Sequence, residues 1–381
     1  MKTWIALFLA VAMALSLCAC GGDKTTSDST APGESTPNSS TPDNSKPDDE
    51  QKDQNVTVSL LTEITVTEKN ADASTDTIKV TLEYDEDYNI IGAKNYFNGK
   101  LSMSTTYNKD VNKPLLEQEY DENGQKTYRQ EFTYDTNGNR LTNYAYDAEG
   151  NIRWGYENTY NADGSVLTEK CFDSGNLVSE FLYTYDTDGK LEYQVSIWED
   201  GSQDWSRFTY DEHGNKLTET TGCDDNLLYE NTYENTYENG KLVEVKAYQD
   251  GDLSNHTRYD ADGHVVLSVS YYAGSEISRE ENVYENGRLI RSTAHSGTEE
   301  TYHLEDTYDA AGRLIERRVK YFATEEETQT YLYNDAGILI GMNSREGDTQ
   351  ISQHTITYES VTVSKALAEK IENIIHTLGI I

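Results

Sequence analysis

Pairs of aspartates in short Asp-x-Asp-Gly stretches are the first residues whose spacing could support chemistry. Asp186 and Asp188 form one pair, and Asp260 and Asp262 form another. Carboxylates this close are typical of calcium loops, but an EF-hand loop needs glycine at its sixth position and glutamate at its twelfth. In both stretches the glycine comes at the fourth position and the glutamate is missing. We therefore expect hairpin turns, at most a weak association with Ca²⁺, no metal site and no cofactor.

The chain lacks the common catalytic motifs. Seven histidines are scattered along the chain, and the sequence contains no His-Glu-x-x-His, Gly-x-Ser-x-Gly or phosphate-binding loop. Carboxylates are so numerous that any two could be matched to the spacing of a glycosidase, so such a pair has no weight as evidence. The sequence predicts a protein without catalytic residues, and a glycoside-acting hydrolase is the less favoured alternative.

Three tryptophans in the middle of the chain, Trp154, Trp198 and Trp205, are the candidate ligand-binding residues. An indole ring offers a broad apolar face and one N–H donor, which suits stacking against a sugar ring. Trp154 and Trp198 can equally replace tyrosine in the strand pattern described below. Trp205 lies an odd number of residues before Tyr210, on the charged face of its strand. We therefore expect Trp205 to be the most exposed of the three.

The charge balance restricts the possible partners. The chain has 31 basic and 68 acidic residues, a net charge of −37. A surface this acidic repels nucleic-acid phosphates and anionic lipid headgroups, which excludes nucleic acid as a partner.

A phrase of tyrosine followed by a turn recurs along most of the chain. It reads "YDTNGNRLTN" from Tyr134, "YDTDGKLEYQ" from Tyr185 and "YDEHGNKLTE" from Tyr210, with a period of about 25 residues. Asp135 is placed to open a type I turn, and Gly138 to supply the left-handed residue that closes a bulged hairpin. The shorter Asn-Gly and Asp-Gly copies, including "WEDGSQ" from Trp198, predict two-residue turns.

Between the turns, aromatic and charged residues alternate with the period of a strand. Tyr229, Tyr233 and Tyr237 fall on one face, and acidic residues fall on the other. Tyrosine suits this position because its ring can pack while its hydroxyl stays in water. The pattern predicts an all-β antiparallel meander of roughly twenty strands over 56–362, which twist would coil into a spiral or curled open sheet.

The chain ends with a change of period. From Ser364, placed as an N-cap, apolar residues follow helical spacing. We expect an amphipathic capping helix over 363–381, because a repeat array needs its ends covered.

The N-terminus carries a targeting pattern. Lys2 precedes an apolar run of about a dozen residues, too short to span a membrane and typical of a secretory signal. The run ends in "LCAC", which resembles the lipobox of bacterial lipoproteins. The resemblance implies a signal peptide over 1–19 and a diacylglyceryl group on the thiol of Cys20, and two or more acyl chains anchor a protein stably. A plain secreted protein is the alternative.

A polar segment separates this anchor from the repeats. Residues 20–55 are rich in Ser, Thr, Pro and Asp, and prolines recur every fifth residue from Pro32 to Pro47. Such a segment cannot bury a core, so we expect a disordered stalk on the extracellular side of a bacterial membrane.

The recurring Y-D-x-x-G-x-[L/I/V] phrase resembles the YD, or RHS, repeat over about three quarters of the chain. The resemblance implies a β-meander that coils into a shell or spiral, an extracellular location, and a role in carbohydrate binding or cell contact. Large members of that family enclose a toxin, whereas this repeat body is too short to enclose a further domain.

Together these patterns predict a non-catalytic, lipid-anchored binding protein of the cell surface. Its ligand would be a wall or host glycan, or another surface protein. The rival hypothesis is a structural spacer or coat protein with no defined ligand.

Overall fold

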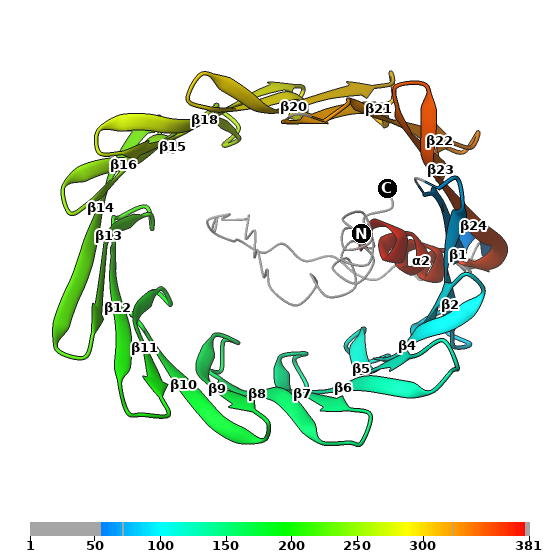
Figure 1. The fold of residues 1–381 in the computed structure, drawn as a ribbon, viewed down its shortest axis with the longest axis horizontal. Coiled ribbons are helices and arrows are strands. Elements are labelled where there is room, and N and C mark those ends of the chain that lie inside the picture. The colour runs from blue at the N-terminus through cyan, green and yellow to red at the C-terminus, as the bar shows by residue number, and fades with distance from the viewer. Residues whose placement is uncertain (1–54, 71, 323, 378–381) are drawn as a thin grey trace, which may run out of the picture. The chain divides into compact units, whose positions relative to one another are not determined.

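The computed structural model describes residues 55–70, 72–322 and 324–377, which form twenty-four strands and one helix (Figure 1). The predicted signal peptide, Cys20 and nearly all of the predicted stalk lie outside these residues. The strands are β1 Asn55–Lys69, β2 Thr75–Tyr84, β3 Ile90–Phe97, β4 Lys100–Asn108, β5 Lys113–Tyr120, β6 Lys126–Tyr134, β7 Arg140–Asp147, β8 Ile152–Tyr160, β9 Val166–Asp173, β10 Asn176–Tyr185, β11 Leu191–Trp198, β12 Gln203–Tyr210, β13 Lys216–Cys223, β14 Asn226–Glu238, β15 Lys241–Gln249, β16 Asp252–Tyr259, β17 Val265–Tyr272, β18 Ser275–Glu285, β19 Arg288–Ser296, β20 Glu299–Tyr308, β21 Leu314–Tyr321, β22 Glu327–Tyr333, β23 Leu339–Glu346 and β24 Thr349–Ser364. The helix is α2, Lys365–Thr377.

The sheet closes on itself. Successive strands pair antiparallel, from β1 with β2 to β23 with β24, and β1 also pairs with β24. Thr57 Oγ1 lies 3.0 Å from Thr362 Oγ1, and Thr62 Oγ1 donates to the carbonyl of Thr357 at 3.3 Å. Five residues forward along β1 therefore correspond to five residues backward along β24, so this pair is antiparallel as well.

This closure corrects one part of the sequence prediction and confirms the rest. The all-β antiparallel meander with a C-terminal helix is confirmed, but the spiral or open sheet is wrong. An open sheet leaves two edges of unpaired N–H and C=O groups, and closure pairs them. The final pairing joins segments about three hundred residues apart, so no local pattern could have indicated it.

The chain divides into two compact units. The larger contains 62–85 and 89–357, and the described part of the smaller contains 55–61, 86–88 and 358–377. In the smaller unit, Ile371 and Ala368 of α2 are buried, and Lys370 Nζ donates to the carbonyl of Asp87 at 3.1 Å. None of the described helical residues forms a segment long and apolar enough to cross a bilayer.

Alternation of the two faces is confirmed in the larger unit. Along β14, Tyr229, Tyr233 and Tyr237 are half-buried, whereas the intervening Glu230 and Glu234 are exposed. Buried aliphatic residues are few, and several of the buried side chains are polar, such as Asn143 and Asn158. The sheet is therefore held largely by polar contacts and aromatic rings.

The predicted turn chemistry is confirmed in most places. Asp135 Oδ1 accepts the N–H groups of Asn137 and Asn139, both at 2.8 Å, and Gly138 has φ +83°. Asn239 and Gly240 both have positive φ, 52° and 78°, as a type I′ turn requires. The stretch from Trp198 differs, because Trp198 accepts from Gly201 N–H and donates to Ser202, which gives a longer bulged turn.

Hairpin turns of the larger unit fall into two sets at opposite strand ends, because neighbouring strands are antiparallel. We call the turns after even-numbered strands β4 to β22 rim A, and the turns after odd-numbered strands β1 to β23 rim B.

Tyrosine hydroxyls link the turns of rim A. In each of these bonds, the tyrosine at the end of a strand donates its hydroxyl hydrogen to a main-chain carbonyl of the preceding rim A hairpin. The accepting residue lies two positions after the residue of positive φ in that turn. The bonds are Tyr134 to Pro114 (2.8 Å), Tyr160 to Arg140 (2.7 Å), Tyr185 to Val166 (2.7 Å), Tyr210 to Leu191 (2.8 Å), Tyr308 to Leu289 (3.0 Å) and Tyr333 to Leu314 (2.8 Å). These six phrases thus fasten to the phrase before them, and Tyr237 donates instead to the carboxylate of Asp211, so these hydroxyls are bonded to protein and not left in water.

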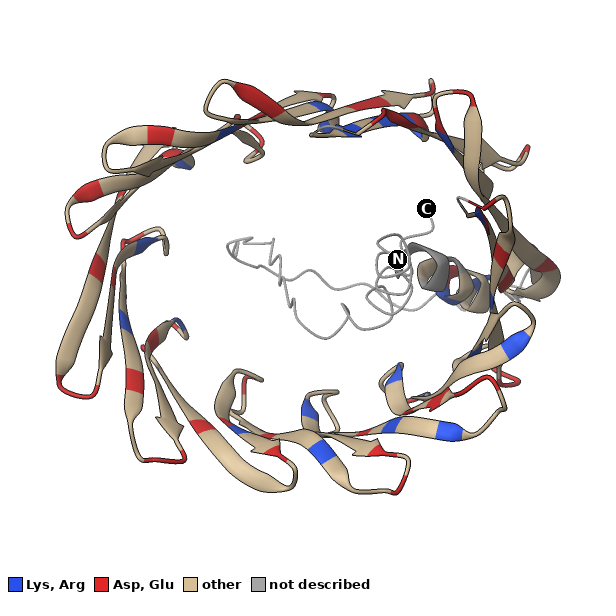
Figure 2. Ribbon diagram, viewed as in Figure 1, with Lys and Arg blue, Asp and Glu red and all other residues tan. Residues whose placement is uncertain are grey.

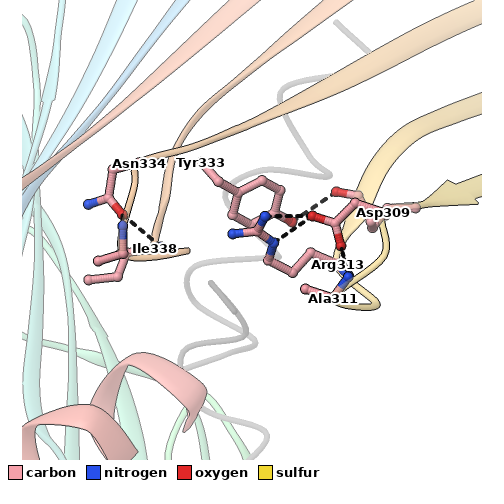
Figure 3. Close-up of polar contacts among 8 residues, drawn as sticks. Asp309, Ala311, Arg313, Tyr333, Asn334 and Ile338 are labelled. Atoms are coloured by element: carbon pink, nitrogen blue, oxygen red, sulfur yellow. Dashed lines mark hydrogen bonds and ion pairs between the residues drawn. The ribbon is translucent and has the colours of Figure 1, made fainter.

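The same turns cover the tyrosine rings. Figure 3 shows Arg313 lying over the Tyr333 ring, with its guanidinium carbon 4.9 Å from the ring centroid, while Asp309 accepts from Arg313 Nε at 2.7 Å. Lys190 lies 5.4 Å from the centroid of the Tyr210 ring in the equivalent position. Cation–π attraction of this kind adds to the hydroxyl bond at four of the six steps, those of Tyr134, Tyr210, Tyr308 and Tyr333.

Rim B is linked by the main chain instead. At seven of its turns, an N–H at the start of the turn donates to a carbonyl in the preceding hairpin, twenty or twenty-one residues earlier. The bonds are Asn98 to Thr77, Ser174 to Arg153, Glu199 to Val178, Asp224 to Gln203, Asp250 to Glu230, Gly297 to Ile277 and Phe322 to Thr301, at 2.7–3.2 Å. Rim B therefore holds together without using its aromatic side chains.

We predict that removing one tyrosine hydroxyl weakens the fold measurably. Tyr210→Phe leaves the ring in place but removes the bond to Leu191, and it should lower the free energy of unfolding by about 1 kcal/mol. The matched control is Tyr272→Phe, because Tyr272 is 76% exposed at rim B. Urea denaturation of residues 21–381 measures both, and equal midpoints for the two variants would contradict the role given to the hydroxyl.

We also predict that acid destabilises the turns. A hydrogen bond from the Asn139 side chain, joined by backbone N–H groups, lowers the pKa of Asp135. Burial alone would raise the pKa of Asp211, but hydrogen bonds from Tyr237 and from Asn215 N–H outweigh it and hold the pKa at about 2.

Unfolding returns these carboxyls to an ordinary pKa near 3.9. Their contribution to stability is therefore complete above about pH 4 and is lost as pH falls toward 2. Asn334 already fills the aspartate position in the β22–β23 turn, where its Oδ1 accepts from Ala336 and Ile338. Replacing Asp121, Asp135 and Asp147 with Asn should thus preserve folding at pH 7 and flatten the decline in urea midpoint between pH 4 and 2. An unchanged decline would show that these turns do not cause it.

Candidate functional site

Large apolar side chains are exposed mainly on rim B. Among the described residues, those most exposed, at 43–76%, all lie at rim B turns: Leu177, Trp198, Leu227, Leu228, Tyr272, Ile277, Tyr321 and Phe322. Apolar side chains at strand ends next to rim A, such as Leu167 and Leu332, are at most 41% exposed. Rim A uses tyrosine hydroxyls and cations for the links described above, whereas the eight apolar side chains at rim B take no part in its main-chain links.

These eight residues lie along one series of hairpins. They fall at five of the seven rim B turns from the β9–β10 turn to the β21–β22 turn, and the β15–β16 and β19–β20 turns contribute none. We call this segment the rim B arc and define it as residues 173–177, 198–203, 223–228, 249–253, 272–277, 296–301 and 321–327.

The rim B arc is also strongly acidic. Figure 2 shows acidic residues at hairpin turns around the sheet. Within the arc the sequence has thirteen acidic residues and no Lys, Arg or His: Asp173, Glu199, Asp200, Asp224, Asp225, Asp250, Asp252, Glu276, Glu299, Glu300, Glu325, Glu326 and Glu327. All but Glu327 are exposed. The arc therefore combines apolar side chains with negative charge, of which Glu276 is paired with Arg279 at 2.9 Å.

Trp198 lies at the β11–β12 turn of this arc and is 43% exposed. Its Nε1 donates to Asp204 Oδ2 at 2.9 Å, which fixes the orientation of the ring. The ring borders an open hollow of about 850 Å³ whose other lining residues are Val178, Glu199, Asp200 and Ser202. An oriented, exposed indole beside polar groups is able to stack against a ligand ring.

Trp205 is less exposed than the sequence predicted. Its ring lies against Gly222 on the paired strand, so that a Cβ added to Gly222 would come within 2.2 Å of it. Its Nε1 donates to the carbonyl of Asp224 at 2.8 Å. The expectation that Trp205 is the most exposed tryptophan is therefore wrong, because the ring occupies the space that glycine leaves empty.

Trp154 is half-buried and lies edge-on to Tyr156, with ring centroids 5.7 Å apart. It belongs to β8, whereas Trp198 and Trp205 share the β11–β12 hairpin on opposite faces. The three tryptophans thus do not form one platform. Sorting the turns by rim would have revealed the arc in the sequence, since the alternation of strands was already predicted.

The aspartate pairs behave as turn residues. Asp260, Asp262 and His264 bring ligand atoms within 4.8 Å of one another. However, Asp260 already accepts the N–H groups of Asp262 and His264 and contacts His264 Nδ1 at 3.0 Å. The side-chain bond from His264 lowers the pKa of Asp260, so the turn itself accounts for the cluster.

Carboxyls in unusual surroundings do occur elsewhere in the sheet. Burial, and then the nearby charge of Glu119, raises the pKa of Glu117. A second hollow, of about 610 Å³, contains Asp306, whose carboxylate is buried and held by Arg317 through two bonds of 2.7 Å. Neither of the two hollows described here contains Glu117. These carboxyls therefore do not form a paired site of the kind a glycosidase uses.

Comparison with known proteins gives only distant likenesses. No protein-family model and no curated protein matches the chain. Among solved structures, the Tc holotoxin pore of Photorhabdus luminescens is 14% identical over 80% of this chain and 19% of that chain, with a TM-score of 0.35. The TcdB2-TccC3 complex without its hypervariable C-terminal region is 13% identical over 80% and 23%, with a TM-score of 0.26.

A porin-like protein from Bacteroides uniformis is also similar, at 13% identity over 78% of this chain and 98% of that chain, with a TM-score of 0.24. The chain spans about a fifth of the length of the toxin chains that it matches. The resemblance to YD repeats and to lipoproteins stays a prediction from the sequence.

Proposed function

We propose that this chain is a non-catalytic binding protein, anchored by lipid at Cys20 on the extracellular face of a bacterial membrane, that engages its ligand through rim B. The "LCAC" stretch and the polar segment over 20–55 support the anchor and the stalk. Rim B supports the binding role.

The observation that carries the proposal is the difference between the two rims. Rim A uses its tyrosines to fasten one turn to the next, whereas rim B exposes eight large apolar side chains. Exposed apolar groups that lie together typically mark a surface that contacts a partner, and Leu227 with Leu228 and Tyr321 with Phe322 are adjacent pairs on rim B. A spacer with no ligand would gain nothing from this arrangement.

The ligand classes expected from the sequence, a glycan or a surface protein, fit different parts of rim B. Trp198, with its ring oriented by Asp204, suits a sugar ring. The aliphatic residues Leu227, Leu228 and Ile277 suit apolar side chains of a protein. Trp154 and Trp205 stay secondary candidates because their rings already contact neighbouring residues.

We predict that Cys20→Ser abolishes incorporation of a labelled fatty acid and releases the protein from membranes. Cys18→Ser is the matched control, because Cys18 lies within the predicted signal peptide and should leave labelling unchanged. Labelling of cells that express each variant, followed by membrane fractionation, tests this. Equal labelling of the two variants would contradict anchoring at Cys20.

We predict that binding depends on rim B. The soluble chain, residues 21–381, should bind whole cells or isolated cell wall saturably, and Trp198→Ser combined with Tyr272→Ser and Phe322→Ser should weaken binding at least tenfold. The control combines Leu167→Ser, Leu217→Ser and Leu332→Ser, which remove three apolar groups at strand ends next to rim A. Equal loss in the two triple variants, or no saturable binding by the folded parent, would favour the structural spacer.

A further inference from the structure

The rim B arc differs in charge from the rest of the turns. Its seven segments have thirteen acidic residues and no basic one. Rim B turns before the arc are followed directly by Lys100 and Lys126, and rim A includes Lys190 and Arg313, whereas Arg279 and Lys320 of the arc hairpins lie just outside the seven segments. Negative charge is therefore concentrated on the same segment that exposes apolar side chains.

The arc is long and continuous. Main-chain bonds join neighbouring hairpins at five of the six steps along the arc, as from Phe322 N–H to Thr301 and from Gly297 N–H to Ile277. Strands lie about 4.8 Å apart, so seven consecutive hairpins span roughly 60 Å. A small molecule would cover one hairpin, whereas an extended polymer or a protein surface would contact the whole arc.

The aliphatic residues favour a polypeptide over a glycan. Four of the eight exposed residues, Leu177, Leu227, Leu228 and Ile277, have no flat ring to stack on a sugar. The aromatic ones are far apart, because Trp198 and Tyr272 lie six strands from each other, or about 29 Å. Aliphatic side chains gain most from contact with other apolar side chains.

The negative charge of the arc favours a polypeptide that is rich in Lys and Arg. Carboxylates around an apolar surface attract Lys and Arg and repel acidic partners. A second copy of this chain would bring two acidic arcs together, which like-charge repulsion disfavours. Anionic lipids are disfavoured for the same reason.

We infer that the rim B arc docks a cationic amphipathic polypeptide, with its apolar side chains on Leu227, Leu228 and Tyr272 and its Lys and Arg side chains facing the neighbouring carboxylates. This inference rests on the proposed binding function of rim B and specifies its ligand class. It predicts binding that needs both the apolar and the acidic groups of the arc and that weakens with salt.

The test uses the full mature chain and three synthetic peptides of equal length. The first is an amphipathic helix of Lys, Leu and Trp, the second replaces Lys with Glu, and the third replaces Leu and Trp with Ser. Fluorescence anisotropy should show saturable binding of the first peptide, and at least tenfold weaker binding of the other two.

Two sets of variants then locate the binding. The arc variant combines Asp250→Asn, Asp252→Asn, Glu299→Gln and Glu300→Gln, and the control combines Asp188→Asn, Glu212→Gln, Asp262→Asn and Glu285→Gln at or beside rim A turns. Both remove four exposed acidic charges. The arc variant should bind the first peptide at least tenfold more weakly than the parent, and the control should change the affinity less than twofold. Leu227→Ser with Leu228→Ser should also weaken binding at least tenfold.

Equal effects in the arc variant and the control would show non-specific attraction to an acidic protein and would overturn the inference. If the first peptide fails to bind while binding to cells still requires Trp198, Tyr272 and Phe322, the inference falls and the proposed function survives with a glycan ligand. If binding to cells does not require rim B either, both fall.

Discussion

The hydrogen bond from a tyrosine hydroxyl to a carbonyl of the preceding phrase is the interaction on which the rest of this structure depends. Hydrophobic burial cannot supply the needed stability alone, because few aliphatic residues are buried in a sheet of twenty-four strands. Each bond, as from Tyr210 to Leu191, joins two turns that are one hairpin apart. Repetition along rim A makes each hairpin the support for the next, in the manner of other repeat proteins. Closure through β1 and β24 then removes the two ends that such an array would otherwise expose.

Rim A contributes mainly to the stability of the fold, whereas rim B is the rim to which we assign contact with a ligand. At rim A, tyrosine hydroxyls and cations such as Arg313 bond neighbouring turns to one another. Rim B is linked by main-chain groups and by carboxylates such as Asp224 and Asp250, so its exposed apolar side chains take no part in these links. An acidic and apolar surface can therefore be carried there without loss of the fold. This separation is the physical basis for assigning the binding function to rim B.

Much of the fold follows from short patterns. The Asp135 and Gly138 turn, the alternation along β14 and the helix after Ser364 each depend on neighbouring residues, and each agrees with the sequence prediction. Features that depend on partners distant in sequence did not follow. Closure needs β24 beside β1, the tyrosine bond needs a carbonyl about twenty residues earlier, and the lower exposure of Trp205 needs Gly222 across the strand pair. The arc could have been predicted from the sequence, because antiparallel strands place alternate turns at opposite strand ends and so assign every turn to one rim.

Site-specific photo-crosslinking in intact cells tests the central claim most directly. The full-length protein would carry a photoreactive amino acid either at Tyr272, exposed on rim B, or at Leu167, exposed near rim A. The account predicts a discrete crosslink to a basic polypeptide from position 272, reduced by high salt, and none from position 167. Crosslinks of equal yield from both positions, or a discrete crosslink only from position 167, would contradict the assignment of binding to rim B.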